Sequence, residues 1–138
     1  MIKSMKNGLA KSNMKKNLSV KHPANILATN NLFAKIPMNL KDEYFENILR
    51  GEDFFLERIV SEGQTTPKGT WLCEETNEWV LLLSGSAKLQ FKTIDNIQAL
   101  HPGDHITIPA GTYHRVSCTD QNDKTVWLAI HYSAKVKG

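Results

Sequence analysis

The chain of 138 residues is long enough for one domain with a hydrophobic core, but not for two. Its hydrophobic content of 41 % is typical of a globular protein, and no apolar run reaches the roughly 18–20 residues that a membrane-spanning helix needs. The net charge of +3 comes from residues 1–30, which hold six lysines and no acid, so the remaining chain is not a basic nucleic-acid-binding domain.

Residues 1–30 are rich in Lys, Asn and Ser and show no sustained apolar period. This composition predicts a flexible, disordered basic tail rather than a folded element. A lysine-bearing arm can contact a polyanion, but the tail lacks the arginine and aromatic residues with which proteins stack on bases. We therefore expect no nucleic-acid partner and place the folded domain at residues 31–135.

Residues 40–50, LKDEYFENILR, carry apolar side chains at helical spacing. Leu40, Tyr44 and Ile48 lie on one stripe of a helix, and Gly51 is a natural end for it. The pattern predicts one short helix ahead of the rest of the domain.

After this segment the apolar period changes to two, which is typical of strands. Residues 86–92 alternate cleanly, whereas residues 78–85 are nearly all apolar, as in a strand buried on both faces. The expected strands are 54–61, 78–85, 86–92, 97–100, 105–109, 113–118 and 125–132. Short strands separated by turn residues, with no helices between them, predict an all-β, antiparallel barrel or double sheet over about residues 52–132.

The chain has only two cysteines, Cys73 and Cys118. Two are too few for a disulfide-stapled secreted domain, so we expect a cytoplasmic protein in which both thiols are reduced. The sequence shows no Ser-His-Asp order, phosphate-binding glycine loop or CxxC pair. Any chemistry is therefore expected inside the barrel.

Two motifs give the chain a resemblance to a known family. Gly103, Pro109, Gly111 and His114 follow one another at the spacing of the second cupin motif, and the segment 78–85 resembles the end of the first. The sequence is thus similar to small single-domain cupins, a group of mostly uncharacterised bacterial proteins. The resemblance implies a cupin-type jelly-roll β-barrel, here with one short N-terminal helix and a basic tail.

Cupin metal sites usually take two histidines and a glutamate from the first motif and one histidine from the second. The resemblance assigns the glutamate to Glu78 and the second-motif histidine to His114. The two first-motif histidines fall on Leu72 and Glu74 or, with one more spacer residue, on Trp71 and Cys73, and neither placement offers a histidine. Two of the four ligands are therefore replaced, and the asparagine that often closes the second motif becomes Cys118.

The ligand set is open to two interpretations. Glu74 or His131 could join Glu78 and His114 to hold one divalent ion, namely Fe, Mn, Zn or Ni. Alternatively, Glu78 and His114 hydrogen-bond each other inside the barrel and no ion is needed. We expect Trp71, Cys73, Tyr113 and Cys118 to line the pocket around them.

Three functions remain open on the sequence. The first is a barrel that binds a small molecule, with or without a metal ion. The second is a metal-dependent dioxygenase, isomerase or lyase acting on a small polar metabolite, with no catalytic residue assignable. The third is a structural or regulatory dimer module, because cupins commonly dimerise through their sheets and residues 79–83 and 126–132 are apolar on both faces. A homodimer is expected in each case.

Overall fold

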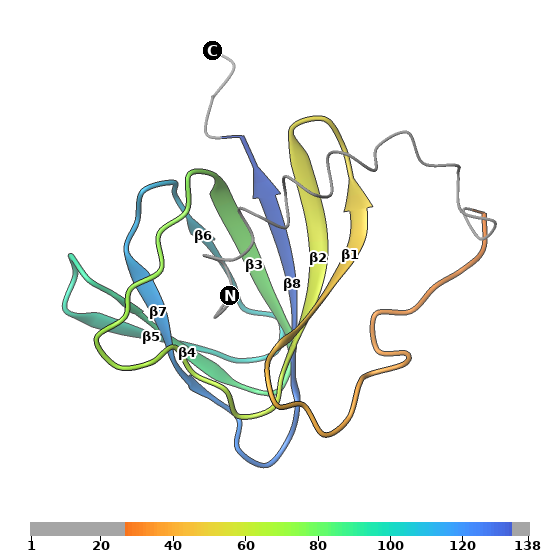
Figure 1. Ribbon diagram of the computed structural model, residues 1–138, viewed down its shortest axis with the longest axis horizontal. Helices are drawn as coiled ribbons and strands as arrows, with labels where there is room; N and C mark the ends of the chain where they lie inside the picture. The colour runs from red at the N-terminus through yellow and green to blue at the C-terminus, as the bar shows by residue number, and fades with distance from the viewer. Residues whose placement is uncertain (1–26, 134–138) are drawn as a thin grey trace.

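The computed structural model describes residues 27–133, which form eight strands and no helix (Figure 1). The strands are β1 (Tyr44–Arg50), β2 (Phe54–Ser61), β3 (Asn77–Ser84), β4 (Ala87–Phe91), β5 (Asn96–Leu100), β6 (His105–Ile108), β7 (His114–Thr119) and β8 (Thr125–Tyr132). This part of the chain therefore contains no helix that could cross a membrane. The predicted tail, residues 1–30, lies outside the described residues except for its last four positions, and it stays a prediction.

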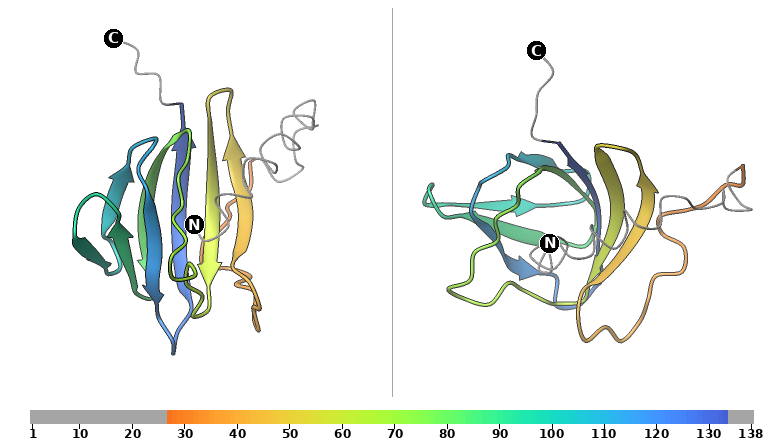
Figure 2. Two further views of the ribbon diagram at one scale, coloured as in Figure 1. Left: turned by 60° about the vertical axis from the view of Figure 1, so that its left-hand side comes forward. Right: turned by 45° about the horizontal axis from the view of Figure 1, so that its top comes forward.

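The strands form two antiparallel sheets that face each other as a jelly-roll barrel (Figure 2). The five-stranded sheet has the order β1-β2-β8-β3-β6, and the three-stranded sheet has the order β5-β4-β7. Both sheets pair strands that are far apart in the sequence. In the larger sheet β8 pairs with β2 and β3, and in the smaller sheet β7 pairs with β4. The all-β jelly-roll architecture expected from the sequence is confirmed.

The core lies between the two sheets and comes from the inward positions of the strands. Its buried apolar members are Ile59, Val80, Leu82, Ala87, Leu89, Leu100, Ile108, Val116, Trp127 and Ala129. In β3 the inward residues Val80 and Leu82 are fully buried, whereas the outward residues Trp79 and Leu81 are only half-buried. The near-continuous apolar run in β3 therefore reflects a buried inner face and a partly covered outer face, not a strand buried on both faces.

The predicted helix over residues 40–50 is wrong, because Tyr44–Arg50 forms strand β1 at the edge of the larger sheet. Two features prevent the helix. The backbone of Leu40 is held by side chains of the β2–β3 connection, with its N–H donating to Glu62 Oε2 at 2.8 Å and its carbonyl accepting from Gln64 Nε2 at 3.1 Å. From Tyr44 onward, the backbone pairs with the otherwise unpaired edge of β2. This strand pairing outweighs the weak helical periodicity of the sequence.

The β1–β2 pairing changes the expected boundary of the barrel. Strand pairing begins at Tyr44, opposite Val60, rather than near residue 52. Gly51, expected to end a helix, instead begins the hairpin turn, where its N–H donates to the carbonyl of Phe54 at 2.9 Å. Phe45 packs against the core from β1, so this strand contributes to the barrel interior.

Candidate functional site

Polar side chains interrupt the apolar interior at one level of the barrel. In β3 and β8 the inward positions are buried and the outward ones half-buried, which places Glu78 and His131 inside with Val80 and Ala129. Glu78 and His131 are also directly opposite each other in the β3–β8 pairing. The larger sheet therefore presents a carboxylate and an imidazole side by side to the interior.

His114 enters the interior from the opposite sheet, at the start of β7. Its backbone is clamped by Leu72, because the N–H of each residue donates to the carbonyl of the other, at 2.7 and 2.9 Å. The ring atom Nδ1 lies 2.8 Å from the carbonyl oxygen of Thr112. A carbonyl can only accept, so Nδ1 carries the proton, and in the neutral ring Nε2 is left as an acceptor.

His114 and Glu78 meet across the barrel, as the motif spacing predicted. His114 Nε2 lies 4.0 Å from Glu78 Oε2, and both side chains are 1 % exposed. This separation is too long for a direct hydrogen bond. Within residues 27–133, neither Glu78 oxygen nor His114 Nε2 has a hydrogen-bond partner. The site thus consists of two buried groups facing each other with acceptor atoms and no donor between them.

A second carboxylate–imidazole pair lies on the larger sheet. His131 Nε2 is 2.9 Å from Glu57 Oε1, and the His131 ring stacks on Phe55 with centroids 4.3 Å apart and planes 12° apart. His131 therefore pairs with Glu57 and not with Glu78, its neighbour in register. Glu57 was missed at the level of sequence, since a single glutamate in FFLERIVS carries no motif.

The other predicted ligand, Glu74, lies in the loop before β3. Its carbonyl accepts from the N–H of Gly111 at 2.9 Å, which ties this loop to the β6–β7 connection. The side chain is half-buried. Among the residues that the structure describes, no three His, Cys, Asp or Glu side chains lie together as a metal-binding group. Glu74 and His131 are thus not assembled with Glu78 and His114 into one site.

The four predicted pocket residues differ in burial. Trp71 and Cys73 are half-buried on either side of Leu72, and Cys118 is half-buried opposite Lys88, an exposed position of β4. Tyr113 is 47 % exposed, with Lys92 Nζ 5.4 Å from its ring centroid. Trp71, Cys73 and Tyr113 directly flank the bridge between Leu72 and His114, and the role of the four residues as a pocket lining stays a prediction. Both cysteines are free thiols.

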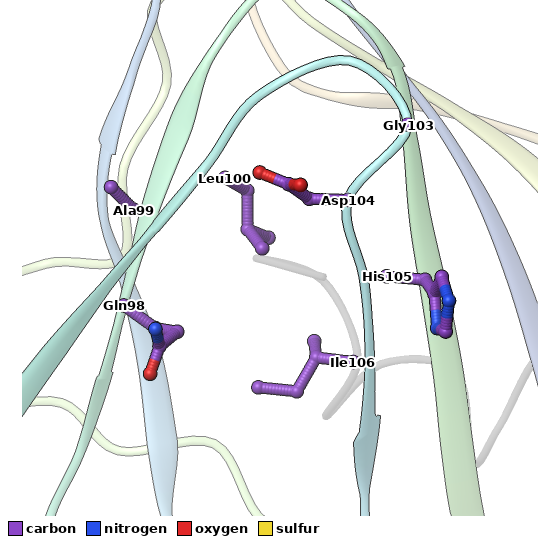
Figure 3. Close-up of a pocket in the computed structure, with 7 residues that line it drawn as sticks. All are labelled: Gln98, Ala99, Leu100, Gly103, Asp104, His105 and Ile106. Carbon is purple, nitrogen blue, oxygen red and sulfur yellow. The ribbon is translucent and has the colours of Figure 1, made fainter.

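An open cleft of about 420 Å³ lies elsewhere, between β5 and β6, where the edges of the two sheets diverge (Figure 3). It is lined by Gln98, Ala99, Leu100, Gly103, Asp104, His105 and Ile106. In Figure 3, Leu100, Asp104 and Ile106 point toward the space between the strands. None of the predicted site residues lines this cleft. We place the functional site at Glu78 and His114, because both side chains are fully buried and their unpartnered atoms face each other.

The spacing of the pair tests which occupant would fit it. A tetrahedral ion with bonds of roughly 2.0–2.2 Å to nitrogen and oxygen would hold those two atoms about 3.4 Å apart. The observed separation of 4.0 Å is wider. For a single nitrogen donor placed about 2.9 Å from both acceptors, the angle between the two acceptors would be about 90°, narrower than the roughly 109–120° between two N–H bonds. The pair as it stands therefore matches neither occupant without some adjustment of the side chains.

Comparison with known proteins identifies relatives among solved structures. Neither the protein-family models nor the curated proteins gave a match. A protein of Ralstonia eutropha JMP134, provisionally named a mannose-6-phosphate isomerase, is 40 % identical over 77 % of this chain and 98 % of that chain, with a TM-score of 0.74.

More distant structures share the fold. A cupin superfamily protein of Desulfitobacterium hafniense DCB-2 is 16 % identical, covers 71 % of this chain and 84 % of its own, and has a TM-score of 0.58. The cupin domain of Schizosaccharomyces pombe Cnp3 is 13 % identical, covers 77 % of this chain and 69 % of its own, and has a TM-score of 0.62.

Proposed function

This chain belongs to the cupin superfamily, and on that premise we propose that its barrel interior binds a small polar molecule through Glu78 and His114. The observation that carries the proposal is the pair of facing acceptors 4.0 Å apart, with no donor from residues 27–133. Leaving a buried polar group without a hydrogen bond costs about 1–3 kcal/mol. A ligand that donates to both groups removes that cost.

The two residues have complementary roles in this proposal. The Thr112 carbonyl fixes the orientation of the His114 ring, so that Nε2 is presented to the interior before a ligand arrives. Glu78 comes from the other sheet and supplies two carboxylate oxygens. Because both groups are held by strands rather than loops, they form a preorganised recognition element, and preorganisation lowers the entropy lost on binding.

The site is closed to solvent, since Glu78 and His114 are both fully buried. A ligand therefore needs a transient opening. The loops before β3 and β7 lead into the strands of Glu78 and His114. The Gly111 N–H donates to the Glu74 carbonyl of the first loop, and the Ala110 N–H donates to Asn77 Oδ1 at the start of β3. Breaking these two bonds would separate the loops, and we place the access route there.

A divalent ion is the competing occupant. In its favour, the two unpartnered groups are a carboxylate and an imidazole whose other nitrogen is held by a carbonyl, as is usual for histidine ligands. Against it stand the 4.0 Å separation and the lack of a third assembled ligand within the described chain. Glu74 or His131 would have to move to complete a site for Fe, Mn, Zn or Ni.

An enzymatic role is the second candidate function. It is supported by the isomerase name of the 40 % identical relative and by a buried carboxylate facing an imidazole. Such a pair can exchange protons with a bound metabolite, as isomerases and lyases require, whereas a dioxygenase would require the metal ion. Substrate turnover that is lost in both Glu78→Gln and His114→Gln would favour this candidate over simple binding.

The test of the binding proposal is a thermal-unfolding screen of tag-free protein with single compounds at 10 mM. The panel contains simple amines, amidines, polyols, sugars and carboxylates, together with MnCl2, ZnCl2, NiCl2 and Fe(II) salts. We expect at least one organic class to raise Tm in the wild type but not in Glu78→Gln, because a ligand that binds only the folded state stabilises it. If no organic compound gives a shift that depends on Glu78, the binding proposal is wrong.

We further propose that the protein forms a homodimer through the outer face of the larger sheet, in the cytoplasm. Trp79 is paired with Ile130 and Leu81 with Leu128 on that face, and all four are half-buried in the single chain. A contiguous apolar surface of this kind is typical of interfaces. Light scattering should give twice the chain mass for the wild type and the chain mass for Leu128→Lys.

A further inference from the structure

We infer that the interior ligand is a small organic cation, such as a protonated amine or amidine, and not an anionic or phosphorylated metabolite. This inference rests on the proposed binding site and specifies the chemistry that the site selects. It follows from the distribution of charged groups across the barrel wall rather than from the pair alone.

Within residues 27–133, the buried side chains that can be charged are mostly acids and histidines. They are Glu43, Glu57, Arg58, Glu78, His114 and His131. Glu43 accepts a hydrogen bond from the Ser61 hydroxyl, and Glu57 is paired with His131. Glu78 is the acid among them whose two oxygens have no hydrogen bond from this part of the chain. Its two oxygens are therefore the ones with which a ligand can pair.

Two arginines of the barrel strands, Arg58 and Arg115, are committed elsewhere. Arg58 donates from Nη1 to the carbonyls of Leu32 and Ala34, at 2.9 and 2.7 Å, and its Nε lies 3.1 Å from Glu46. These contacts hold the segment that precedes β1 against the outer face of the larger sheet.

Arg115 follows His114 in β7 and takes the outward position. Its Nη1 donates to Gln90 Oε1 at 3.0 Å, and its Nη2 donates to the Thr66 carbonyl at 2.9 Å. Both arginines therefore satisfy groups outside the barrel, and neither balances Glu78.

The remaining atoms of the pair are acceptors. In the neutral ring, His114 Nε2 is an acceptor because Nδ1 carries the proton that is donated to Thr112, and both oxygens of the Glu78 carboxylate accept. An ammonium or amidinium group offers at least two N–H donors and a positive charge, so it matches the acceptors and the charge together. A carboxylate or phosphate would place further acceptors against Glu78 in a medium of low dielectric, which is strongly unfavourable. A sugar phosphate, the substrate class in the name of the 40 % identical relative, does not fit this interior.

Three probes of nearly the same size and shape test the inference, namely acetamidinium, acetamide and acetate at neutral pH. Binding is followed by NMR shifts of the His114 and Leu72 amides. We expect acetamidinium to bind with a dissociation constant in the millimolar range, at least tenfold more tightly than acetamide, and acetate not to bind. A millimolar constant needs about 4 kcal/mol, which is within reach of a ligand of four heavy atoms.

Two variants provide the control. In Glu78→Gln the acetamidinium affinity should fall at least tenfold, to the level of acetamide. Glu75→Gln removes an exposed acid from the adjacent loop and should leave the affinity unchanged.

Three outcomes would overturn the inference. They are acetate or acetamide binding as tightly as acetamidinium, acetamidinium giving no Glu78-dependent shift at 50 mM, and stoichiometric metal in the purified protein that is lost in Glu78→Gln. A separate result would overturn the proposed binding site, namely that no organic compound of the thermal screen raises Tm in a way that depends on Glu78.

Discussion

His114 Nε2 and Glu78 Oε2 lie 4.0 Å apart at the centre of the barrel, although they come from different sheets. His114 begins β7 in the three-stranded sheet, and Glu78 lies in β3 of the five-stranded sheet. The gap between the two groups is therefore a gap between the two walls of the barrel. A ligand that donates to both residues would join the sheets, and its binding would be coupled to the stability of the whole fold.

Removing the charge of Glu78 should stabilise the ligand-free protein. In Glu78→Gln the amide can donate to His114 Nε2, which replaces a contact between two acceptors by a hydrogen bond. We expect the free energy of unfolding to rise by about 1–3 kcal/mol, the typical cost of an unsatisfied buried group. Urea denaturation measures it, with the exposed Glu75→Gln as a control that stays within about 0.5 kcal/mol of the wild type. A loss of stability in Glu78→Gln would show that the carboxylate is satisfied in the native state.

Breaking the buried pair of His131 and Glu57 should, in contrast, lower the free energy of unfolding. His131→Phe keeps a ring to stack on Phe55 but leaves the Glu57 carboxylate buried without its partner. We expect a loss of about 3–5 kcal/mol, as for other broken buried pairs. The double variant Glu57→Leu with His131→Phe should recover part of this loss, because no unpaired carboxylate remains. Additive effects in this cycle would contradict the assigned pair.

Two glycines with similar backbone angles should respond differently to alanine. Gly85 has a φ of 86°, and an added Cβ would lie 2.6 Å from the Thr125 Cα, so Gly85→Ala should cost at least about 2 kcal/mol. Gly103 has a φ of 94° but no neighbour within 4 Å of an added Cβ. Gly103→Ala should therefore lower the free energy of unfolding only by the cost of a positive φ in alanine, about 1 kcal/mol. Equal losses in thermal or urea unfolding would contradict the packing described at Gly85.

Asp120 should make the free energy of unfolding depend on pH in the acid range. Backbone N–H groups of Asp123 and Asn122 donate to its carboxylate and hold the pKa of Asp120 below its ordinary value of 3.8. A lowered pKa in the folded state contributes stability above the unfolded pKa, and this contribution is lost as the pH falls through the folded pKa. NMR titration should place the Asp120 midpoint below 3.8, and Asp120→Asn should flatten stability in that range. A midpoint at or above 3.8 would show that these bonds are absent in solution.

The sequence predicts the strands of this barrel well where a buried face alternates with a solvated one. In β4, Ala87 and Leu89 are buried and Lys88 is exposed, as the period of two requires. The prediction fails at β1, where Tyr44–Arg50 shows a helical period but pairs with β2. That outcome depends on a free strand edge and on side chains from residues 62–64, which are far away in sequence.

The candidate site was predictable in part for the same reason. Spacing within two motifs brings Glu78 and His114 together, because strand register fixes which positions face inward. The partner of His131 was not predictable, since either Glu57 or Glu78 is adjacent to it across a strand. The choice of Glu57 depends on the position of the ring over Phe55, and this is set by packing rather than by any local pattern.

A high-resolution crystal structure of the wild-type protein soaked in acetamidinium would show directly whether a cationic ligand lies between His114 and Glu78. We expect the amidinium nitrogens to lie about 2.9 Å from His114 Nε2 and from Glu78 Oε2, with the Thr112 carbonyl still accepting from Nδ1. This expectation would be contradicted by a direct His114–Glu78 hydrogen bond with the probe bound elsewhere or not at all.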